Sequence, residues 1–213
     1  MAADERIEAI ADPLVRELAR RGVVRSLARN TVFIHEGEQG DSLFVILSGR
    51  VKVFVADAEG REMVLDFHGP GDYVGEMALD GRPRAASVMA VEPTVVSVLT
   101  REALRAAIAA NPDVAMNLIG TLIERARIAT ENVRNLALMD VYGRVARLLL
   151  SLAVERPDGK MVVPERLTHQ DIADRVGASR DMVSRIFKDL TIGGYVTVVD
   201  RQITINRKPP PRW

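Results

Sequence analysis

The 213-residue sequence contains no cysteine, and only 4% of its residues are aromatic. Without cysteine there is no disulfide, no thiolate nucleophile and no iron–sulfur cluster held by thiolates. The three histidines, His35, His68 and His169, lie far apart and lack the short spacing of metal ligands. No apolar run approaches the ~20 residues that span a bilayer, and no signal peptide is visible. We therefore expect a soluble cytoplasmic protein without a metal site or a membrane partner.

The sequence has enough apolar residues for a packed core, since 47% of it is hydrophobic. Its net charge is zero but unevenly distributed. From Asp140 onward there are 13 Lys and Arg against 9 Asp and Glu, so the last third carries +4 and the remainder −4. A basic C-terminal third is a weak indication of nucleic-acid binding.

In the first 110 residues the apolar side chains recur with two different spacings. Ile7, Ile10, Leu14 and Leu18 recur at steps of three and four, which predicts helix over residues 3–29, with a second helix starting at Pro13. From residue 30 the period becomes two, and glycine-marked turns separate the apolar runs. These runs predict strands over residues 31–35, 42–47, 50–55, 61–67, 87–91 and 94–99. Many short strands with such turns indicate an antiparallel double-sheet roll.

A long helix is predicted from Asn111 to about Met139, with Gly120 its only breaker. Its apolar residues form a heptad seam, which predicts a two-helix coiled coil and hence a homodimer. The alternative is that the helix is buried on its own roll, for which a second stripe is available. The seam residues are Met116, Ile119, Ile123, Ala126, Thr130, Val133 and Ala137, and the second stripe is Leu118, Leu122, Ala129 and Leu136.

Between two predicted strands lies a segment suited to an anionic ligand. Gly75 permits a tight turn before Glu76, a carboxylate that can accept hydrogen bonds from ribose hydroxyls. Arg84 can direct two N–H donors at a phosphate, and the small residues Ala85, Ala86 and Ser87 allow backbone N–H groups to approach it. The alternative is a surface loop in which Glu76 and Arg84 pair with each other.

Residues 167–190 predict two short helices with the spacing of a helix-turn-helix. Thr168 and Ser179 are the predicted N-caps, and Gly177 separates the helices. A hairpin predicted over residues 193–205 would form the wing of a winged helix. The outward residues suit DNA, since arginine pairs with guanine, a carboxylate accepts from cytosine, and lysine binds phosphate. The predicted DNA-binding residues are Thr168, Gln170, Ser179, Arg180, Asp181, Ser184, Arg185 and Lys188.

The segment Gly75-Glu76-Met77-Ala78-Leu79, followed by Pro83-Arg84-Ala85-Ala86-Ser87, resembles the phosphate-binding cassette of cyclic-nucleotide-binding domains. The order of roll, long helix and winged helix over residues 12–206 resembles the CRP/FNR family of bacterial transcription regulators. The resemblance implies an α+β fold: a cyclic-nucleotide-binding β-roll of the jelly-roll type with N-terminal helices (residues 1–110), a dimerisation helix (111–139) and a winged helix-turn-helix (140–213).

The resemblance also implies the roles of the ligand-binding residues. Glu76 would hold the ribose and Arg84 the cyclic phosphate, and Thr130 of the dimerisation helix would touch the base across the dimer. Ala129 stands where cAMP-responsive members usually carry a threonine that contacts adenine, and one such bond is worth about 1 kcal/mol. The predicted ligand-binding residues are Gly75, Glu76, Met77, Ala78, Arg84, Ala85, Ser87 and Thr130.

The predicted function is therefore ligand-controlled binding to a palindromic DNA operator, with RNA polymerase an expected partner and no cofactor beyond the effector. cAMP is the favoured effector, and cyclic GMP and cyclic di-GMP are alternatives. A ligand-independent regulator with a relic cassette is another alternative. An enzyme is not expected, because the sequence shows no nucleophile, acid–base pair or metal cluster.

Overall fold

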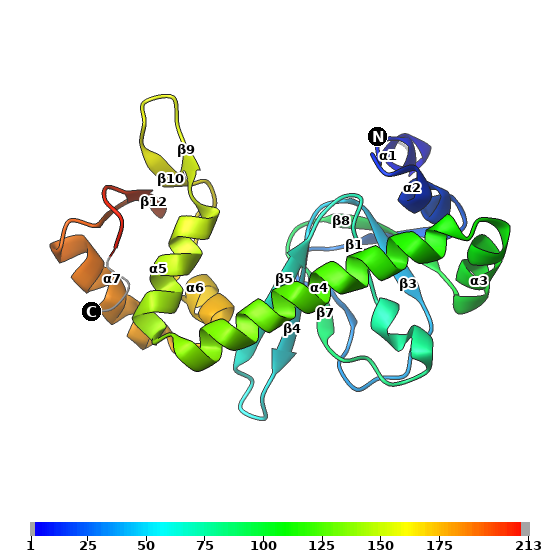
Figure 1. Ribbon diagram of the computed structural model, residues 1–213, viewed down its shortest axis with the longest axis horizontal. Helices are drawn as coiled ribbons and strands as arrows, with labels where there is room; N and C mark the ends of the chain where they lie inside the picture. The colour runs from blue at the N-terminus through cyan, green and yellow to red at the C-terminus, as the bar shows by residue number, and fades with distance from the viewer. Residues whose placement is uncertain (1–2, 210–213) are drawn as a thin grey trace. The chain divides into compact units, whose positions relative to one another are not determined.

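The chain folds into two compact units, seen in a computed structural model that describes residues 3–209. The first unit comprises the N-terminal part of the chain to residue 55 together with residues 64–127. The second comprises residues 56–63 and the chain from residue 128 onward. Figure 1 traces the chain from the N-terminal helices in blue, through the strands of the roll, to the C-terminal helices in orange.

Two four-stranded sheets form the roll in the first unit. One has the order β1 (Val23–Leu27), β8 (Thr94–Leu99), β3 (Leu43–Ser48), β6 (Tyr73–Val74). The other has the order β2 (Val32–Ile34), β7 (Ser87–Ala90), β4 (Val51–Ala56), β5 (Glu62–His68). The β3–β8 and β4–β7 pairs are antiparallel, as the glycine-marked turns predicted, and the β1–β8 pair, which was not predicted, is antiparallel too.

The core of the roll lies between the two sheets. Its buried cluster takes residues from strands of both sheets, namely Ile34, Ile46, Val51, Val74, Val88 and Val96. The opposite face of the first sheet is covered by helices, so that Leu43, Val45 and Leu47 are buried there. Strand β3 is therefore buried on both faces, which explains why its sequence is a continuous apolar run rather than an alternating one.

The predicted helix over residues 3–29 is wrong beyond residue 20. Helices α1 (Ala3–Glu8) and α2 (Pro13–Arg20) form, and the Asp12 carboxylate caps α2 by accepting from the Leu14 N–H at 2.8 Å. The chain then continues as strand β1, all five residues of which pair with β8. Gly22 lets the chain approach β8 closely, because a Cβ at this position would lie 2.2 Å from the Ser97 hydroxyl oxygen. Tertiary pairing thus overrides the helical pattern.

Helix α3 (Arg101–Ala110) follows the roll, and α4 (Asp113–Leu138) is the long helix that the sequence predicts. All seven predicted seam residues are exposed, Met116 by 64% and Val133 by 65%. Of the second stripe only Leu118 is buried, whereas Leu122, Ala129 and Leu136 are exposed, so the alternative that this stripe packs on the roll holds at Leu118 alone. The buried face of α4 includes Val114 and Leu118.

Among residues 3–209, no single helix is long and apolar enough to cross a membrane. The same length and composition test is passed only by α3 and α4 taken together, and these two helices meet at an angle of 117°.

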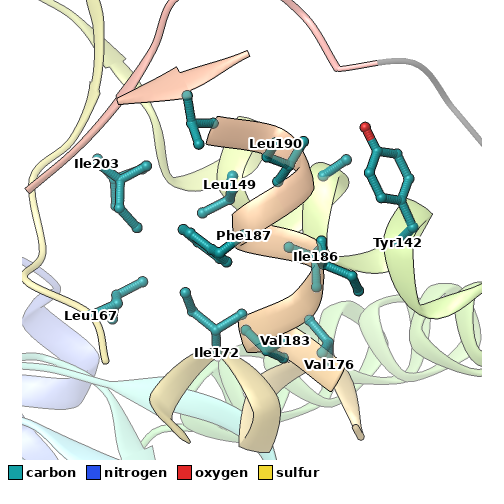
Figure 2. Close-up of a cluster of buried hydrophobic side chains, with 14 of the residues drawn as sticks. Tyr142, Leu149, Leu167, Ile172, Val176, Val183, Ile186, Phe187, Leu190 and Ile203 are labelled. Carbon is teal, nitrogen blue, oxygen red and sulfur yellow. The ribbon is translucent and has the colours of Figure 1, made fainter. Parts of the chain in front are cut away.

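The second unit contains the predicted winged helix-turn-helix. Its helices are α5 (Val141–Leu152), α6 (His169–Val176) and α7 (Arg180–Ile192). Its sheet has the order β11 (Val196–Val199), β12 (Gln202–Ile205), β10 (Met161–Val163), β9 (Val154–Glu155). Figure 2 shows side chains from α5, α6, α7 and β12, including Leu149, Ile172, Phe187 and Ile203, converging in one core.

The N-caps of α6 and α7 are those that the sequence predicts. Thr168 and Asp171 form a capping box at the start of α6, and the Ser179 hydroxyl accepts from the Met182 N–H at the start of α7. Gly177 ends α6 with a left-handed φ of 62°, a conformation that costs other residues free energy. The turn between the two helices is therefore encoded locally.

The core of the winged helix should be sensitive to truncation. Leu190 of α7 is completely buried, whereas Ile192 of the same helix is 75% exposed. We expect Leu190→Ala to lower the free energy of unfolding of this unit by about 2–5 kcal/mol, because it leaves a cavity. Ile192→Ala should change it by less than about 0.5 kcal/mol. Urea denaturation followed by circular dichroism measures both, and equal effects would contradict the packing.

Candidate ligand and DNA sites

The predicted cassette is a tightly folded segment between β6 and β7. Gly75 has φ +93°, and a Cβ there would lie 2.7 Å from the Ser42 carbonyl oxygen and 2.8 Å from Nη1 of Arg84. Glycine is therefore required for both conformation and space. Residues Glu76–Asp80 form one 3-10 turn, and the chain reaches Arg84 before β7 begins at Ser87.

Arg84 is buried, with 8% of its surface exposed. Its Nη1 donates to the Gly75 carbonyl at 2.7 Å and its Nη2 to the Ser42 carbonyl at 3.0 Å. The same residue is held through its backbone, since the Arg84 N–H donates to the Glu38 carbonyl and the Gly37 N–H donates to the Arg84 carbonyl, each at 2.9 Å. The guanidinium is thus fixed in place before any ligand binds.

The charge of Arg84 is only partly compensated. Burial lowers the pKa of its guanidinium, while the carboxylates of Asp41 and Glu76 oppose that shift. An arginine nevertheless stays charged in a protein, and it carries five N–H donors. Its hydrogen bonds to two neutral carbonyls leave donors for an incoming anion.

Gly40 lies against the same guanidinium. A Cβ at residue 40 would lie 2.5 Å from Nε and 2.6 Å from Nη2 of Arg84. These contacts are far shorter than real ones, so a side chain at residue 40 would displace the guanidinium. The loop before β3 therefore helps to shape the cassette.

Glu76 does not pair with Arg84, so the surface-loop alternative is wrong. Its side chain is 7% exposed, and its Oε1 lies 2.7 Å from Nη1 of Arg125 on α4. Arg125 also donates from Nη2 to the Tyr73 carbonyl at 2.6 Å and lies over the Tyr73 ring, 5.5 Å from its centroid. One arginine thus joins α4, β6 and the cassette.

The sequence reasoning did not single out Arg125, although a signal exists. Val114 and Leu118 are buried on one face of α4, and steps of four, three and four lead from Val114 through Leu118 and Thr121 to Arg125. A charged residue on the buried face of an amphipathic helix needs a partner. That requirement points to a carboxylate beneath the helix, and Glu76 meets it.

The other predicted ligand-binding residues differ in their setting. The Ser87 hydroxyl accepts from the Glu36 N–H at 3.0 Å, Ala85 is exposed, and Met77 is 62% exposed. Ala78 belongs to the 3-10 turn, but its side chain lies outside the described part of the structure. Thr130 lies on α4 in the second unit. Their roles in binding stay predictions.

The predicted DNA-binding residues fall into two groups. Within residues 3–209, no hydrogen bond or ion pair engages the exposed side chains of Arg180, Asp181, Arg185 and Lys188. The hydroxyls and amide of the other four are engaged inside the protein: Thr168 with Asp171, Gln170 with Asp174, Ser179 with the Met182 N–H, and Ser184 with the Arg180 carbonyl. The first group can bind DNA without breaking an internal bond.

Arg144 of α5 is a second residue that the sequence reasoning did not single out. Its guanidinium donates to the carbonyls of Met139 at 2.9 Å, Val176 at 2.8 Å and Gly177 at 3.3 Å. These carbonyls follow α4 or end α6, positions where a backbone carbonyl lacks an N–H donor from its own helix. Arg144 therefore connects the end of α4 to the turn of the helix-turn-helix.

The roll with its buried Glu76 and Arg84, and the winged helix with its free basic residues, define a nucleotide-binding module joined to a DNA-binding module. Residues 24–111 match the family model of the cyclic nucleotide-binding domain, and residues 143–209 match that of the Crp-like helix-turn-helix domain. The chain belongs to the CRP/FNR family of transcription regulators.

Curated relatives cover most of the chain. It is 33% identical over 201 residues to the cAMP-activated global transcriptional regulator CRP of Salmonella typhimurium, covering 91% of this chain and 94% of the relative. It is 36% identical over 181 residues to the CRP-like cAMP-activated global transcriptional regulator of Mycobacterium tuberculosis, covering 83% and 80%. The solved structure of the c-di-GMP responsive global regulator CLP from Xanthomonas campestris matches with a TM-score of 0.78 and 25% identity, covering 91% of this chain and 99% of that one.

The ion pair of Glu76 and Arg125 should stabilise the first unit. We expect Arg125→Met to lower the free energy of unfolding by about 1–3 kcal/mol, because it leaves a buried carboxylate without its partner. Arg125→Met combined with Glu76→Gln should cost less than the sum of the single changes, with a coupling of about 0.5–3 kcal/mol.

The matched control for this double-mutant cycle is Arg127→Met, two residues along α4. Its side chain is 76% exposed and lies 3.9 Å from Glu124. We expect a change of less than about 0.5 kcal/mol in urea denaturation. Additive effects of the Arg125 and Glu76 changes would contradict the structural role of the pair.

Proposed function

We propose that this protein is a homodimeric transcription regulator in which a cyclic nucleotide, with cAMP favoured, binds in the roll and controls the placement of the two α7 helices on a palindromic operator. The observation that carries this proposal is the paired burial of Glu76 and Arg84 in the cassette. The Glu76 carboxylate, which we propose for the ribose hydroxyls, and the Arg84 guanidinium, which we propose for the cyclic phosphate, are both held by contacts within the protein. Preorganisation of this kind reduces the cost of binding.

The choice of cAMP rests on the relatives and is weakened by one residue. The curated relatives are named as cAMP-activated, whereas the structurally similar CLP is named as c-di-GMP responsive. Ala129 has no hydroxyl for an adenine amine, while Thr130 keeps one. We therefore retain cyclic di-GMP as the second candidate effector, and cyclic GMP as a third.

The homodimer is supported by the exposed face of α4. The seam contains Met116, Ile119, Ile123 and Val133, which are 46–65% exposed in the single chain. Apolar residues at alternating steps of three and four over seven positions are typical of a coiled-coil interface. Pairing two α4 helices would bury this surface and carry Thr130 into the seam.

Communication between the two sites is proposed to pass along α4. Arg125 ties the helix to Glu76 in the first unit, and Arg144 ties its end to the helix-turn-helix in the second. A ligand that changes the contacts of Glu76 would therefore act on α4 directly. It controls DNA binding only if its affinity differs between the two arrangements of the helices. We place this activity in the cytoplasm, with RNA polymerase as the expected further partner.

The ligand site is tested by a matched pair of arginines. Arg84→Leu should weaken binding of the effector about ten- to hundredfold, because a charge-assisted hydrogen bond contributes about 1.5–3 kcal/mol. Arg82→Leu, whose side chain is 85% exposed, should leave the affinity unchanged. Isothermal titration with cAMP, cyclic GMP and cyclic di-GMP measures both variants and identifies the effector. Equal affinities for the two variants would show that the anion site lies elsewhere.

The same titration distinguishes a ligand-controlled regulator from a ligand-independent regulator whose cassette is a relic. If none of the three nucleotides gives a heat with the unmodified protein, and the protein binds its operator without any of them, the cassette is a relic. Effector-dependent DNA binding that Arg84→Leu abolishes and Arg82→Leu preserves is the expected result.

The DNA site is tested by two residues of α7. Arg185→Ala should cost about 1–3 kcal/mol in operator affinity and relax the preference at one base position. Lys188→Ala should weaken binding to all sequences alike and reduce the salt slope by about 1. Fluorescence anisotropy against operator and non-specific duplexes distinguishes these outcomes. A uniform loss in both variants would mean that Arg185 binds phosphate rather than a base.

A further inference from the structure

Three partly buried residues form a line on α4. Asn117, Thr121 and Arg125 follow each other at steps of four, so they share one face of the helix. All other residues of the helix between Leu118 and residue 127 are exposed. The line of these three residues is therefore the face that α4 presents to the rest of the first unit.

The first residue of this line is tied to the N-terminal helices. Nδ2 of Asn117 donates to one oxygen of the Asp12 carboxylate at 2.7 Å, and the other oxygen of that carboxylate caps α2. Thr121 lies one turn further along, and its hydroxyl donates to the Asn117 carbonyl at 3.2 Å. A hydroxyl has one proton and two lone pairs, so the Thr121 oxygen can still accept a hydrogen bond.

Tyr73 of β6 lies beneath the same line. Only 2% of this residue is exposed, and the Arg125 guanidinium lies over its ring, 5.5 Å from the centroid. Nη2 of Arg125 also donates to the Tyr73 carbonyl. Among residues 3–209 the Tyr73 hydroxyl has no hydrogen-bond partner, although its oxygen is buried. A buried hydroxyl without a partner raises the free energy of the arrangement that contains it.

Thr121 carries the hydroxyl that can pair with Tyr73. Burial raises the pKa of the Tyr73 phenol, and the Thr121 side chain is the strongest of the groups that oppose this rise, ahead of Arg125. The two hydroxyls are therefore neighbours, but they lack the geometry of a hydrogen bond in this structure. They are complementary, since the phenol has a proton to donate and the Thr121 oxygen can accept it. A displacement of α4 on the roll changes their separation directly.

We infer that Tyr73 is a positioning residue of the effector response, whose hydroxyl donates to the Thr121 oxygen once the effector has moved α4. The hydrogen bond then favours the effector-bound position of the helix. The inference rests on the proposed function, in which a nucleotide acts on α4 through Glu76, and it deepens that function. Tyr73 belongs to the cluster on the helix-covered face of the first sheet, so it acts through α4 rather than on the nucleotide.

The link to the effector passes through Arg125. Its ion pair with Glu76 joins α4 to the cassette, and one turn of helix separates it from Thr121. A ribose that hydrogen-bonds to Glu76 shares the carboxylate with Arg125. A displacement that follows from this sharing also moves Thr121 over Tyr73, because one turn of a hydrogen-bonded helix moves as a unit.

The two arrangements of α4 fix the direction of the effect. In the free protein the unpaired Tyr73 hydroxyl disfavours the arrangement seen here, and in the second arrangement its hydrogen bond is favourable. An effector that binds the second arrangement therefore gains affinity from this hydroxyl. Removing the hydroxyl abolishes that gain and also frees the first arrangement of a buried group without a partner.

Tyr73→Phe tests the inference, because phenylalanine keeps the ring beneath Arg125 and lacks the hydroxyl. We expect nucleotide affinity to fall about three- to tenfold, the value of one hydrogen bond. The urea denaturation midpoint of the nucleotide-free variant should equal or exceed that of the unmodified protein. Isothermal titration with cAMP, cyclic GMP and cyclic di-GMP gives the affinities. Tyr195→Phe, a matched change in the second unit, should leave them unchanged.

The Thr121 hydroxyl should contribute in the same way. Thr121→Val should weaken nucleotide binding as Tyr73→Phe does, and the double variant should bind as either single variant does, because both changes remove the same hydrogen bond. Thr121→Ser keeps a hydroxyl and should bind as the unmodified protein does. Losses that multiply in the double variant, or a loss in Thr121→Ser equal to that in Thr121→Val, would overturn the inference.

The remaining outcomes separate this inference from the proposed function. If the unmodified protein binds a nucleotide and Tyr73→Phe binds it equally well, the inference is wrong and the proposed function stands. A lower urea midpoint for nucleotide-free Tyr73→Phe would show that the hydroxyl is already bonded in the free protein, which also refutes the inference. If the unmodified protein binds none of the three nucleotides, the proposed function fails and this inference fails with it.

Discussion

The burial of Glu76 is the constraint on which the structure around the predicted ligand site depends. Burial of a carboxylate that is 7% exposed is costly unless a partner offsets the lost solvation. Arg125 is that partner on α4 and at the same time binds the Tyr73 carbonyl. The cassette, the roll and the long helix are thus held by one guanidinium. A nucleotide whose ribose binds Glu76 must share the carboxylate with α4.

The second unit has an analogous connection made by Arg144. Its three carbonyl acceptors belong to the end of α4 and the end of α6. In both units an arginine from one helix satisfies polar groups of neighbouring elements. The two arginines differ in what they bind, since Arg125 neutralises a charge and Arg144 satisfies backbone acceptors. A change of charge at the cassette therefore acts directly on the Arg125 connection, and only through α4 on the Arg144 connection.

Most of the fold could be predicted because its signals are local. Alternating apolar residues and glycine turns placed the strands β2 to β5, β7 and β8, and Thr168, Gly177 and Ser179 delimited the two helices of the helix-turn-helix. Strand β1 was missed because its pairing with β8, 67 to 75 residues away, decides its conformation. No local pattern records that pairing.

The sequence predicted the motif of the candidate site, but not the residues that its side chains contact. Glu76 and Arg84 stand in a recognisable segment. The sequence of that loop does not indicate that Glu76 pairs with Arg125 while Arg84 donates to backbone carbonyls. Arg125 and Arg144 act across helices, and the hydrogen bonds of Ser184 depend on a histidine 15 residues away. The tertiary structure determines these hydrogen-bond partners, because a donor bonds to an acceptor that the fold brings within about 3 Å.

The glycine at residue 40 has a consequence for anyone who would alter the effector preference of this protein. The Arg84 guanidinium occupies the space that a side chain at residue 40 would need, so a larger residue cannot replace this glycine without moving Arg84. Met77, by contrast, is 62% exposed, so its side chain has room to vary. Libraries aimed at the predicted ligand site should therefore keep Gly40 constant.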